Sequence, residues 1–546
     1  MTRLLIGPLL RHVGTADATI WVETDAPCDV EVLGTRQPTF TVAGHHYALV
    51  TIENLPPAST IEYEVHLDGE KAWPPLHNDR PASRIRTQGG TGPMRIGFGS
   101  CRYGRAAAKV GDKHFDPDSL AAYARVMATQ DERDWLDAFL MLGDQVYADE
   151  TSEATQRRIR AKRDITREPK DQVADFEEYT WLYLESWTDP DVRWLLSNVP
   201  TSMIFDDHDV RDDWNTSDAW RRDMQATDWW EKRIIGGLSS YWVYQHIGNL
   251  SPDELRRNET FQKVCAAEGD AMPLLREFAA HADREADGAK GTKWSFRRDF
   301  GSARLLIIDS RCGRILAGDQ RSMVSEDEFS WIEQQVRGDY DHLLIGTSLP
   351  WLMARALHDI EAWNEKLAAG ARGRRWARWS EKLRRAADLE HWASFRESFE
   401  RLARLIARVG RGECTDAQHA PASVLVLSGD VHHAYAARAQ FPENVPTPVY
   451  QLTCSPLHNY VPAPMRWAFK AGWSHVAERW ARRVLGLVTE VPAASLSWDR
   501  LCGPFFGNEI ATLVLDGRRA EMVLRRAAPA GDPAQLIEVS RLTLAD

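Results

Sequence analysis

The sequence lacks the marks of several protein classes. Its seven cysteines are dispersed along 546 residues without a CxxC pair or a regular ladder, which argues against a disulfide framework and for a reducing compartment. No stretch approaches the roughly 18 to 20 apolar residues that a membrane-spanning helix needs. The chain also has no GxxxxGK(S/T) motif, so a P-loop nucleotide site is excluded.

The charge balance is acidic, and no excess of positive charge is present overall. The 67 Lys and Arg residues face 79 Asp and Glu residues, for a net charge of −12, which favours solubility and offers no global attraction for nucleic acid. The N-terminal segment enters strand-like alternation after one brief apolar run, without a small-residue cleavage site. We therefore expect a cytoplasmic protein with no membrane partner and no sequence-specific nucleic-acid partner. Its oligomeric state stays open.

The length of the chain, and the change from alternating segments to continuous apolar runs along it, indicate two folded units. Residues 1–90 are expected to form a small all-β sandwich of the immunoglobulin or fibronectin type, because several segments alternate in polarity and Asp68-Gly69 is a hairpin signal. The alternating segments begin at Ala18, Asp29 and Ile61. The turn-rich segment 87–93 marks the boundary, and residues 91–546 form the second domain.

In the second domain, short solid apolar runs predict strands that are buried on both faces of a sheet. These runs begin at Met94, Ala138, Ser202, Ala303, His342 and Ser423. Long helical stretches separate them, at 117–137, 151–198, 219–285 and 353–411. Strands and helices that alternate in this way predict an α/β fold.

The last helical stretch, residues 353–411, is rich in Arg, Glu and Trp, and we interpret it as a solvated helical hairpin or lid. The chain has 22 tryptophans, whose simplest role is to seal contacts between helices and a sheet. The basic run 372–378 is interpreted as a solvated helix face, with contact to a polyanionic substrate as the alternative.

Acidic, histidine or thiol groups directly follow four of the predicted strands. They are Ser100-Cys101, Gly143-Asp144 with Tyr147, Asp206 to Asp209, and Gly429-Asp430 with His432-His433. Because ligands bind at the carboxyl edge of the strands in α/β sheets, we expect these turns to converge. Close carboxylates repel one another by roughly 4 kcal/mol per pair at an effective dielectric near 20. Such a cluster is tolerable if cations neutralise it.

The residue types indicate the chemistry of those cations. Asp and His side chains suit Mg, Ca, Mn, Zn or Fe, and a Tyr or Cys anion favours ferric iron or zinc at one position. Two metals about 3.5 to 4 Å apart can activate water to attack phosphorus, and a histidine can protonate the leaving alkoxide. The four turns together therefore predict metal-dependent hydrolysis of a phosphate ester.

Each turn taken alone has an ordinary structural interpretation. Gly143-Asp144 fits a plain turn, and 206–209 fits a helix N-cap cluster. Cys101 fits a small core residue, and His432-His433 fits a buried pair. The prediction therefore depends on the four turns and their order, and not on any one of them.

That order resembles a known family. Gly-Asp, then Asn-His-Asp/Glu, then Gly-His-x-His is the series of the calcineurin-like metallophosphoesterases, and this chain has Gly143-Asp144, 207–209 and 429–432 in the same order. Asp replaces the Asn and the first His. With Gly-Ser-Cys upstream and Gly-Asp-x-x-Tyr, these replacements make the chain similar to the PhoD-like (alkaline phosphatase D) branch. The resemblance spans nearly the whole chain and implies a metallophosphatase-type β-sandwich core flanked by helices, after an N-terminal β-sandwich.

The resemblance implies a role for each matching metal-binding position. Asp144 would bridge two metals, while Cys101 and Tyr147 would bind ferric iron on one side. Asp207 matches the Asn ligand of the series. Asp430 and His432 match its closing pair of metal-binding histidines.

The resemblance also implies catalytic residues and cofactors. His208 would be the general acid or transition-state stabiliser, oriented by Asp209. An Asn that helps to hold calcium in the family corresponds to Asp212 or Asp213 here, and we take Asp212 as the candidate ligand. The implied cofactors are two or more metal ions, Fe3+ with Ca2+, with Mn2+ or Zn2+ as alternatives. The implied partner is a phosphate-ester substrate.

Three other functions are weighed against this one. Ser100 lies in a segment that superficially resembles a nucleophile elbow, but the second glycine of G-x-S-x-G is missing. A catalytically degenerate scaffold that acts as a binding module is the non-enzyme alternative, and a non-phosphate metal hydrolase is the third. The sequence does not choose between monoesters, diesters and polymeric or lipid substrates.

Overall fold

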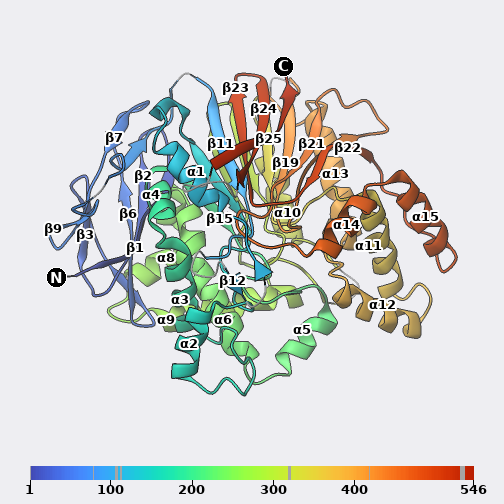
Figure 1. Cartoon of the computed structure of the whole chain (residues 1–546), viewed down its shortest axis with the longest axis horizontal. Coiled ribbons are helices and arrows are strands. Elements are labelled where there is room, and N and C mark those ends of the chain that lie inside the picture. The colour runs from blue at the N-terminus through green and yellow to red at the C-terminus, as the bar shows by residue number, and fades with distance from the viewer. Residues whose placement is uncertain are drawn as a thin grey trace.

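The computed structural model describes residues 2–77, 79–90, 92–104, 109–110, 113–317, 321–416, 419–528 and 535–546. The N-terminal strands lie at one side of the molecule, two larger sheets occupy its middle, and the helices α11, α12, α14 and α15 lie at the opposite side (Figure 1). Within the described ranges, no helix is long and apolar enough to cross a membrane.

The N-terminal region is all β, as predicted. One sheet has the order β1 (Leu4–Val13), β2 (Ala18–Thr24), β6 (His45–Ile52) and β5 (Phe40–Val42). The other has the order β4 (Thr35–Pro38), β3 (Asp29–Val32), β8 (Val65–Leu67) and β9 (Glu70–Trp73). Apolar side chains of both sheets, among them Ile20, Val30 and Val50, form the core between them. The expected hairpin turns at Asp68-Gly69, where both residues have positive φ.

The central core is a sandwich of two sheets. The first has the order β15 (Thr201–Ile204), β14 (Ala138–Leu142), β11 (Met94–Gly99), β23 (Glu509–Asp516), β24 (Arg519–Ala528) and β25 (Gln535–Ala545). The second has the order β16 (Phe296–Phe300), β17 (Ala303–Ile307), β18 (His342–Gly346), β19 (Ser423–Ser428), β21 (Val449–Thr453), β20 (Ala434–Gln440) and β22 (Ser497–Phe505). All six strands predicted from apolar runs are present here. Their side chains meet in a continuous apolar layer between the sheets.

Helices cover both outer faces of this sandwich. Apolar side chains of α1 (Ser119–Met127), α3 (Phe176–Trp187), α4 (Pro190–Asn198), α6 (Trp230–Ser240) and α9 (Met272–Asp283) pack on the first sheet's side. Those of α10 (Glu326–Gln335) and α13 (Arg396–Gly410) pack on the second sheet's side. The predicted α/β class, with a β-sandwich core flanked by helices and preceded by an all-β region, is therefore confirmed.

The helical stretch 353–411 contains α11 (Arg355–Ala368), α12 (Arg374–Ala386) and α13. Two further helices, α14 (Ala463–Gly472) and α15 (His475–Gly486), were not predicted from the sequence. They follow β21 and pack beside α11 (Figure 1). These helices form the side of the molecule opposite the N-terminal sheets.

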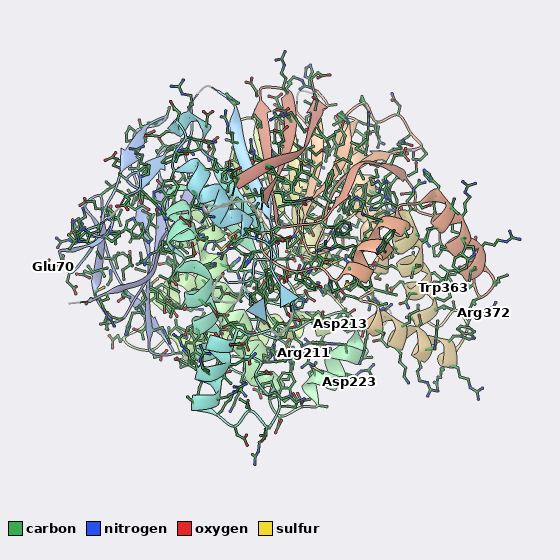
Figure 2. The ribbon with its side chains drawn as sticks, viewed as in Figure 1. Glu70, Arg211, Asp213, Asp223, Trp363 and Arg372 are labelled. Carbon is green, nitrogen blue, oxygen red and sulfur yellow. The ribbon has the colours of Figure 1, made fainter. Side chains whose placement is uncertain are left out.

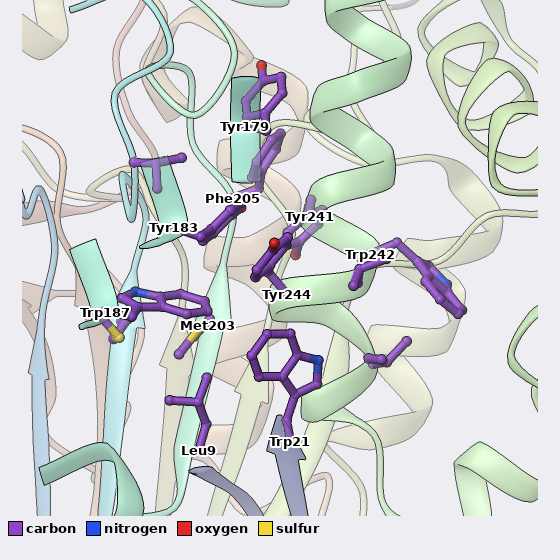
Figure 3. Close-up of a cluster of buried hydrophobic side chains, with 14 of the residues drawn as sticks. Leu9, Trp21, Tyr179, Tyr183, Trp187, Met203, Phe205, Tyr241, Trp242 and Tyr244 are labelled. Carbon is purple, nitrogen blue, oxygen red and sulfur yellow. The ribbon is translucent and has the colours of Figure 1, made fainter. Parts of the chain in front are cut away.

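The N-terminal sheets are joined to the core by a buried contact. Trp21 of β2 lies among the rings of Trp187 and Tyr244, while Tyr183 stacks on Tyr244 with ring centroids 4.0 Å apart (Figure 3). The fully buried Arg11 of β1 donates to the carbonyl oxygens of Thr201, Tyr244 and Gln245. We propose that residues 1–90 and 91–546 are two domains held together by this contact.

His45 generates a test of this contact, because it bridges the two regions. Its Nδ1 lies 3.1 Å from Glu23 and its Nε2 lies 2.8 Å from Glu177 of α3. Burial alone would lower the pKa of His45, but the two carboxylates outweigh it and raise the pKa to about 8. A raised histidine pKa stabilises the fold fully below pH 6.5, and this stability is lost as the pH rises through 8.

We therefore expect His45→Gln to destabilise the protein by about 2 kcal/mol more at pH 6 than at pH 9. Urea unfolding of the wild type and the variant at the two pH values measures the difference. An equal effect of the substitution at both pH values would show that the charged histidine does not stabilise the contact.

Candidate metal centre

The four predicted turns meet at one edge of the sandwich. The turns after β11, β14 and β15 come from parallel neighbours in the first sheet, and the turn after β19 comes from the second sheet. Gly429 permits their close approach, because a Cβ atom there would lie 2.0 Å from Ser100 Oγ and 3.0 Å from the Leu142 carbonyl oxygen. The expected convergence is confirmed.

Convergence brings the predicted ligands within reach of one another. Three groups of donor side chains, each with ligand atoms within 4.8 Å of one another, occur among the described residues. They are Cys101, Asp144 and His432; Asp144, Asp207 and His208; and Asp144, Asp206, Asp207 and Asp430. Asp144 belongs to all three groups, as a bridging ligand would.

Tyr147 lies beside the group that contains the thiol. Its hydroxyl oxygen accepts a 2.6 Å hydrogen bond from the Asn459 amide, whose nitrogen is also 3.5 Å from His432 Nε2. The thiol of Cys101 donates to Asp144 Oδ2 at 3.2 Å. A thiol, a phenol, a carboxylate and an imidazole therefore lie together on this side, which is the donor set that suits ferric iron or zinc.

The backbone of these turns is strained. Several non-glycine residues have positive φ, which costs roughly 1 to 3 kcal/mol each and clusters at functional sites. They include Cys101 at 54°, Asp144 at 52°, Asp430 at 66° and His432 at 48°. The strained positions are predicted ligands, so the left-handed conformation aims their side chains into the site.

The buried carboxylates fit metal ions. Asp144 Oδ1 and Asp206 Oδ2 are buried without a hydrogen-bond partner among the described residues, which is costly for a carboxylate. Burial, together with the neighbouring carboxylates, raises the pKa of Asp144 and of Asp207 well above the ordinary value. A bound cation would relieve both costs, because it attracts the charge and takes the free oxygen atoms as ligands.

Arg311 is a fixed cation within this cluster that the sequence did not predict. Its fully buried guanidinium pairs with Asp206 and with Glu390, and lies 3.2 Å from Asp207 Oδ1 and 3.8 Å from Asp430 Oδ1. Burial would lower its pKa, but the surrounding carboxylates raise it. This single positive charge offsets only part of the negative charge of the four surrounding carboxylates. The uncompensated negative charge would attract metal ions.

His208 is oriented by Asp149 and not by Asp209, which corrects the expectation from the sequence. His208 Nδ1 lies 3.0 Å from Asp149 Oδ1. Burial alone would lower the pKa of His208, but the carboxylates of Asp149 and Asp207 raise it well above its ordinary value. In the same way His208 outweighs burial and lowers the pKa of Asp149 to about 2. The two side chains form a buried ion pair at the wall of the site.

Asp209 instead holds the backbone of the turns. Its carboxylate accepts hydrogen bonds from the backbone N–H groups of Gln145, Val146 and Asp206, at 3.1, 3.1 and 2.9 Å. It therefore ties the turn after β14 to the turn after β15. The sequence suggested the wrong partner because adjacency in sequence does not determine which way a side chain points.

Asp212 lies at the rim. Its carboxylate is 64% exposed and 4.0 Å from His208 Nε2, and it is absent from the three donor groups found in the described chain. Its backbone N–H donates to Asp149 Oδ2 at 2.7 Å. The neighbouring Asp213 donates its N–H to Asp207 Oδ2 at 3.2 Å. A calcium ligand at Asp212 stays a prediction.

Asp430 receives a contact from the helical hairpin. His391, which follows α12, lies with Nε2 3.1 Å from Asp430 Oδ2 and with Nδ1 2.7 Å from Glu361 of α11. Burial would raise the pKa of Asp430, but His391 and Arg311 lower it to about 2. The hairpin predicted as a lid thus orients a candidate metal ligand.

A pocket of about 450 Å³ opens over the site. Its floor includes Asp207, His208, Asp430 and His432, and its walls come from α11, the segment after α12, and α14. Asp213, which also lines it, lies near the middle of the molecule in Figure 2. This volume accommodates a small ligand.

Four residues of the site were missed from the sequence, and one of them carried a signal. They are Asp149, Arg311, His391 and Asn459. Arg311 follows β17, one of the predicted strands, so attention to the turn after every predicted strand would have found it, whereas Asn459 follows β21, which was not predicted. His391 comes from a helical insertion whose position over the sheet edge is set only by tertiary packing.

Two family models match parts of the chain. A family model described as a domain of unknown function matches residues 1–85. A second model, described as PhoD-like phosphatase, matches residues 110–474, which is more than half of the chain. No curated protein matches the chain by sequence.

Two solved structures match the chain in a structural comparison. One, described as the structure of PhoD, has a TM-score of 0.56 at 11% identity and covers 98% of this chain and 90% of its own. The other, purple acid phosphatase PPD1 from yellow lupin (Lupinus luteus) seeds, has a TM-score of 0.49 at 12% identity and covers 98% of this chain and 74% of its own. At this identity the first match shows that the chain shares a fold with PhoD.

The different positions of Asp149 and Asp209 predict different effects of the same substitution. Asp209→Asn should lower the free energy of unfolding by about 1 to 3 kcal/mol, because an amide nitrogen would then face a backbone N–H. Asp149→Asn should destabilise the protein for a different reason, because it removes the charge that pairs with His208 in the buried ion pair, and this cost should depend on pH, which the loss of a neutral hydrogen bond does not. Urea unfolding of both variants without added metal gives the comparison. Equal stability of the Asp209 variant and the wild type would contradict the backbone-holding role.

Proposed function

The chain belongs to the PhoD-like phosphatase family and is a metallophosphoesterase, and we propose that it hydrolyses phosphodiesters and phosphomonoesters with two bound metal ions. Bound metals would supply a Lewis acid and an activated water molecule. This chain's own residues would hold the metals, position the phosphate ester and deliver a proton to the leaving group.

The observation that carries this proposal is the position of Asp144. It is the one side chain common to the three donor groups, and it has a buried oxygen atom without a hydrogen-bond partner among the described residues. The thiol of Cys101 falls in one donor group with Asp144 and His432, whereas the other aspartates fall in the remaining two groups. A carboxylate between two unlike sets of donors suits a pair of unlike metals.

Proposed metal ligands follow from these donor sets. Cys101, Tyr147 and His432 would hold the first ion with Asp144, and this set favours Fe3+, with Zn2+ as the alternative. Asp207 and Asp430, with Asp212 at the rim, would hold the second ion. An all-oxygen set favours Ca2+, with Mn2+ as the alternative. Asp206 joins the last donor group, although its pairing with Arg311 engages one of its oxygen atoms.

His208 is the proposed proton donor. Its Nδ1 is engaged by Asp149, so its Nε2 is the ring nitrogen available to a substrate in the pocket that it lines. A positioned imidazole contributes typically 100-fold to 10,000-fold when a leaving group needs a proton. Asp149 acts through His208 and is a positioning residue.

The serine-hydrolase alternative finds no support at Ser100. Its side chain is fully buried, its Oγ accepts the backbone N–H of Asp430 at 3.0 Å, and it lies 3.2 Å from Cys101 Sγ. A nucleophilic serine must reach the substrate. Ser100 instead fixes the approach of the turn after β19.

Substitution of the bridge separates the leading proposal from its rivals. Asp144→Asn should remove bound metal and lower turnover of bis-p-nitrophenyl phosphate by at least about 1,000-fold, whereas Ser100→Ala should lower it by less than about 10-fold. Elemental analysis of the purified proteins and initial rates measure the two effects. A metal-free wild type whose activity is indifferent to chelators would refute the two-metal proposal. A metal-loaded protein without turnover on phosphate esters would favour the binding module.

Leaving-group dependence tests the role of His208. His208→Ala should slow esters with poor alkyl leaving groups by about 100-fold or more, and esters of p-nitrophenol by much less, because a good leaving group needs no proton. Asp149→Asn should show the same pattern with a smaller loss. Rates across a series of phenyl and alkyl esters, plotted against the pKa of the leaving alcohol, give the dependence of each variant on the leaving group. A uniform loss across the series would assign His208 to binding of the phosphate.

A further inference from the structure

Exposed tryptophan is concentrated at one side of the molecule. The four most exposed tryptophans are Trp376 and Trp379 on α12, Trp467 on α14 and Trp480 on α15, with exposed fractions of 39%, 47%, 77% and 68%. The sequence suggested that tryptophans seal helix–sheet contacts, and most of them are buried. These four instead expose large amphipathic rings to solvent. Such exposure is unusual, because it leaves a large apolar area in contact with water.

Helix α15 carries an apolar stripe that faces outward. Val476, Trp480, Val484 and Leu487 follow one another at intervals of four, four and three residues, so they lie along one face of the helix. Their exposed fractions are 72%, 68%, 39% and 80%. An amphipathic helix of a globular protein ordinarily turns such a stripe toward the core.

The opposite face of α15 is fixed to the protein. Arg482 forms two 2.7 Å hydrogen bonds with the carboxylate of Asp359 on α11. The indole nitrogen of Trp363, also on α11, donates to the carbonyl oxygen of Leu485 at 3.1 Å. These contacts fix the orientation of α15, so its apolar stripe faces outward and does not pack on the protein's own core.

The same helices carry a local excess of positive charge, although the whole chain has a net charge of −12. Their exposed Lys and Arg residues, including the loop before α12, are Arg372, Arg374, Arg375, Arg378, Lys382, Lys470, Arg479 and Arg483. Figure 2 shows Arg372 at the outer edge of the molecule, near Trp363. The acidic residues of α12 and α15, Glu381 and Glu478, already pair with Arg384 and Arg355.

Together these residues form one surface, which we call the tryptophan–arginine face: Trp376, Trp379, Trp467, the stripe of α15, and the eight basic residues. The face spans neighbouring helices, because α12 and α15 both pack against α11, where Trp363 contacts the ring of Trp379 and the backbone of Leu485. It also adjoins the catalytic pocket, since Met465 and Phe469 of α14 line that pocket.

We propose that the tryptophan–arginine face docks on the surface of an anionic phospholipid bilayer. Helices that lie in a bilayer interface combine Trp and Leu side chains with Lys and Arg, and each basic residue near an anionic surface adds to the attraction. A second copy of the chain would bring eight like charges against eight. A polyanion in water would satisfy the basic residues but would leave Val476 and Leu487 exposed.

Docking of this kind revises one expectation from the sequence. We expected no membrane partner because no segment can span a bilayer, but a helix in the interface plane needs only one apolar face. The inference concerns a surface outside the donor groups, so it does not depend on the metals or on the reaction proposed above.

Flotation of the full-length protein with lipid vesicles tests the proposal. The protein should bind vesicles of phosphatidylcholine with phosphatidylglycerol, bind pure phosphatidylcholine much less, and lose binding as salt is raised. Trp467→Ser with Trp480→Ser, and separately Arg479→Glu with Arg483→Glu, should each weaken binding by at least about 10-fold. Far-UV circular dichroism and the midpoint of urea unfolding should be unchanged in solution, which shows that the variants are folded.

Matched controls come from the other parts of the surface. Leu76→Ser and Ile537→Ser remove exposed apolar side chains of 96% and 47% exposure, and Arg167→Glu reverses an exposed charge. All three should bind vesicles as the wild type does. Absence of binding to anionic vesicles, or equal binding by the face variants and the wild type, would overturn the proposal. So would a dimer in analytical ultracentrifugation that the double tryptophan substitution dissociates, because a second copy would then cover the face.

Discussion

Mutual repulsion of carboxylates at one edge of the sandwich is the constraint on which the rest of the site depends. The side chains of Asp144, Asp206, Asp207 and Asp430 each offer one oxygen atom, and these oxygen atoms lie within 4.8 Å of one another. Electrostatic repulsion costs roughly 4 kcal/mol for each close pair of ionised carboxylates at an effective dielectric near 20. Arg311 and the histidine beside Asp430, His391, supply compensating charge from within the protein. Bound cations would offset much of the remaining negative charge, so the affinity for metal and the stability of these turns depend on the same interactions.

The geometry of the site depends on packing between two sheets. Cys101, Asp144 and Asp207 extend from one sheet, whereas Asp430 and His432 extend from the other. The apolar layer between the sheets therefore determines the distances between donors that belong to different sheets. A core substitution far from any ligand could shift one half of the site against the other, because close-packed interiors transmit strain.

Patterns within a single strand or turn were predictable, and contacts between distant segments were not. All six buried strands followed from apolar runs, and the convergence of four turns followed from the polar residues behind four of those strands. One predicted strand divides into β7 (Thr60–Glu62) and β8, which pair in different sheets. The partner of His208 was assigned to a sequence neighbour, but a turn brings Asp149 to it instead. His391 and the outward face of α15 are products of helix packing that no local pattern encodes.

The contact of Arg11 with β15 affects whether the rest of the chain can be separated from residues 1–90. β15 is the outermost strand of its sheet, and Arg11 occupies the carbonyl oxygen of Thr201 at its start. Uncovered edge strands recruit strands of other molecules. The N-terminal sheets thus share the cover of this edge with Asn249, whose side chain engages both backbone groups of Met203. A truncated chain that begins after residue 90 would expose the start of this strand and the aromatic rings around Trp187, and we expect it to aggregate more readily than the full chain.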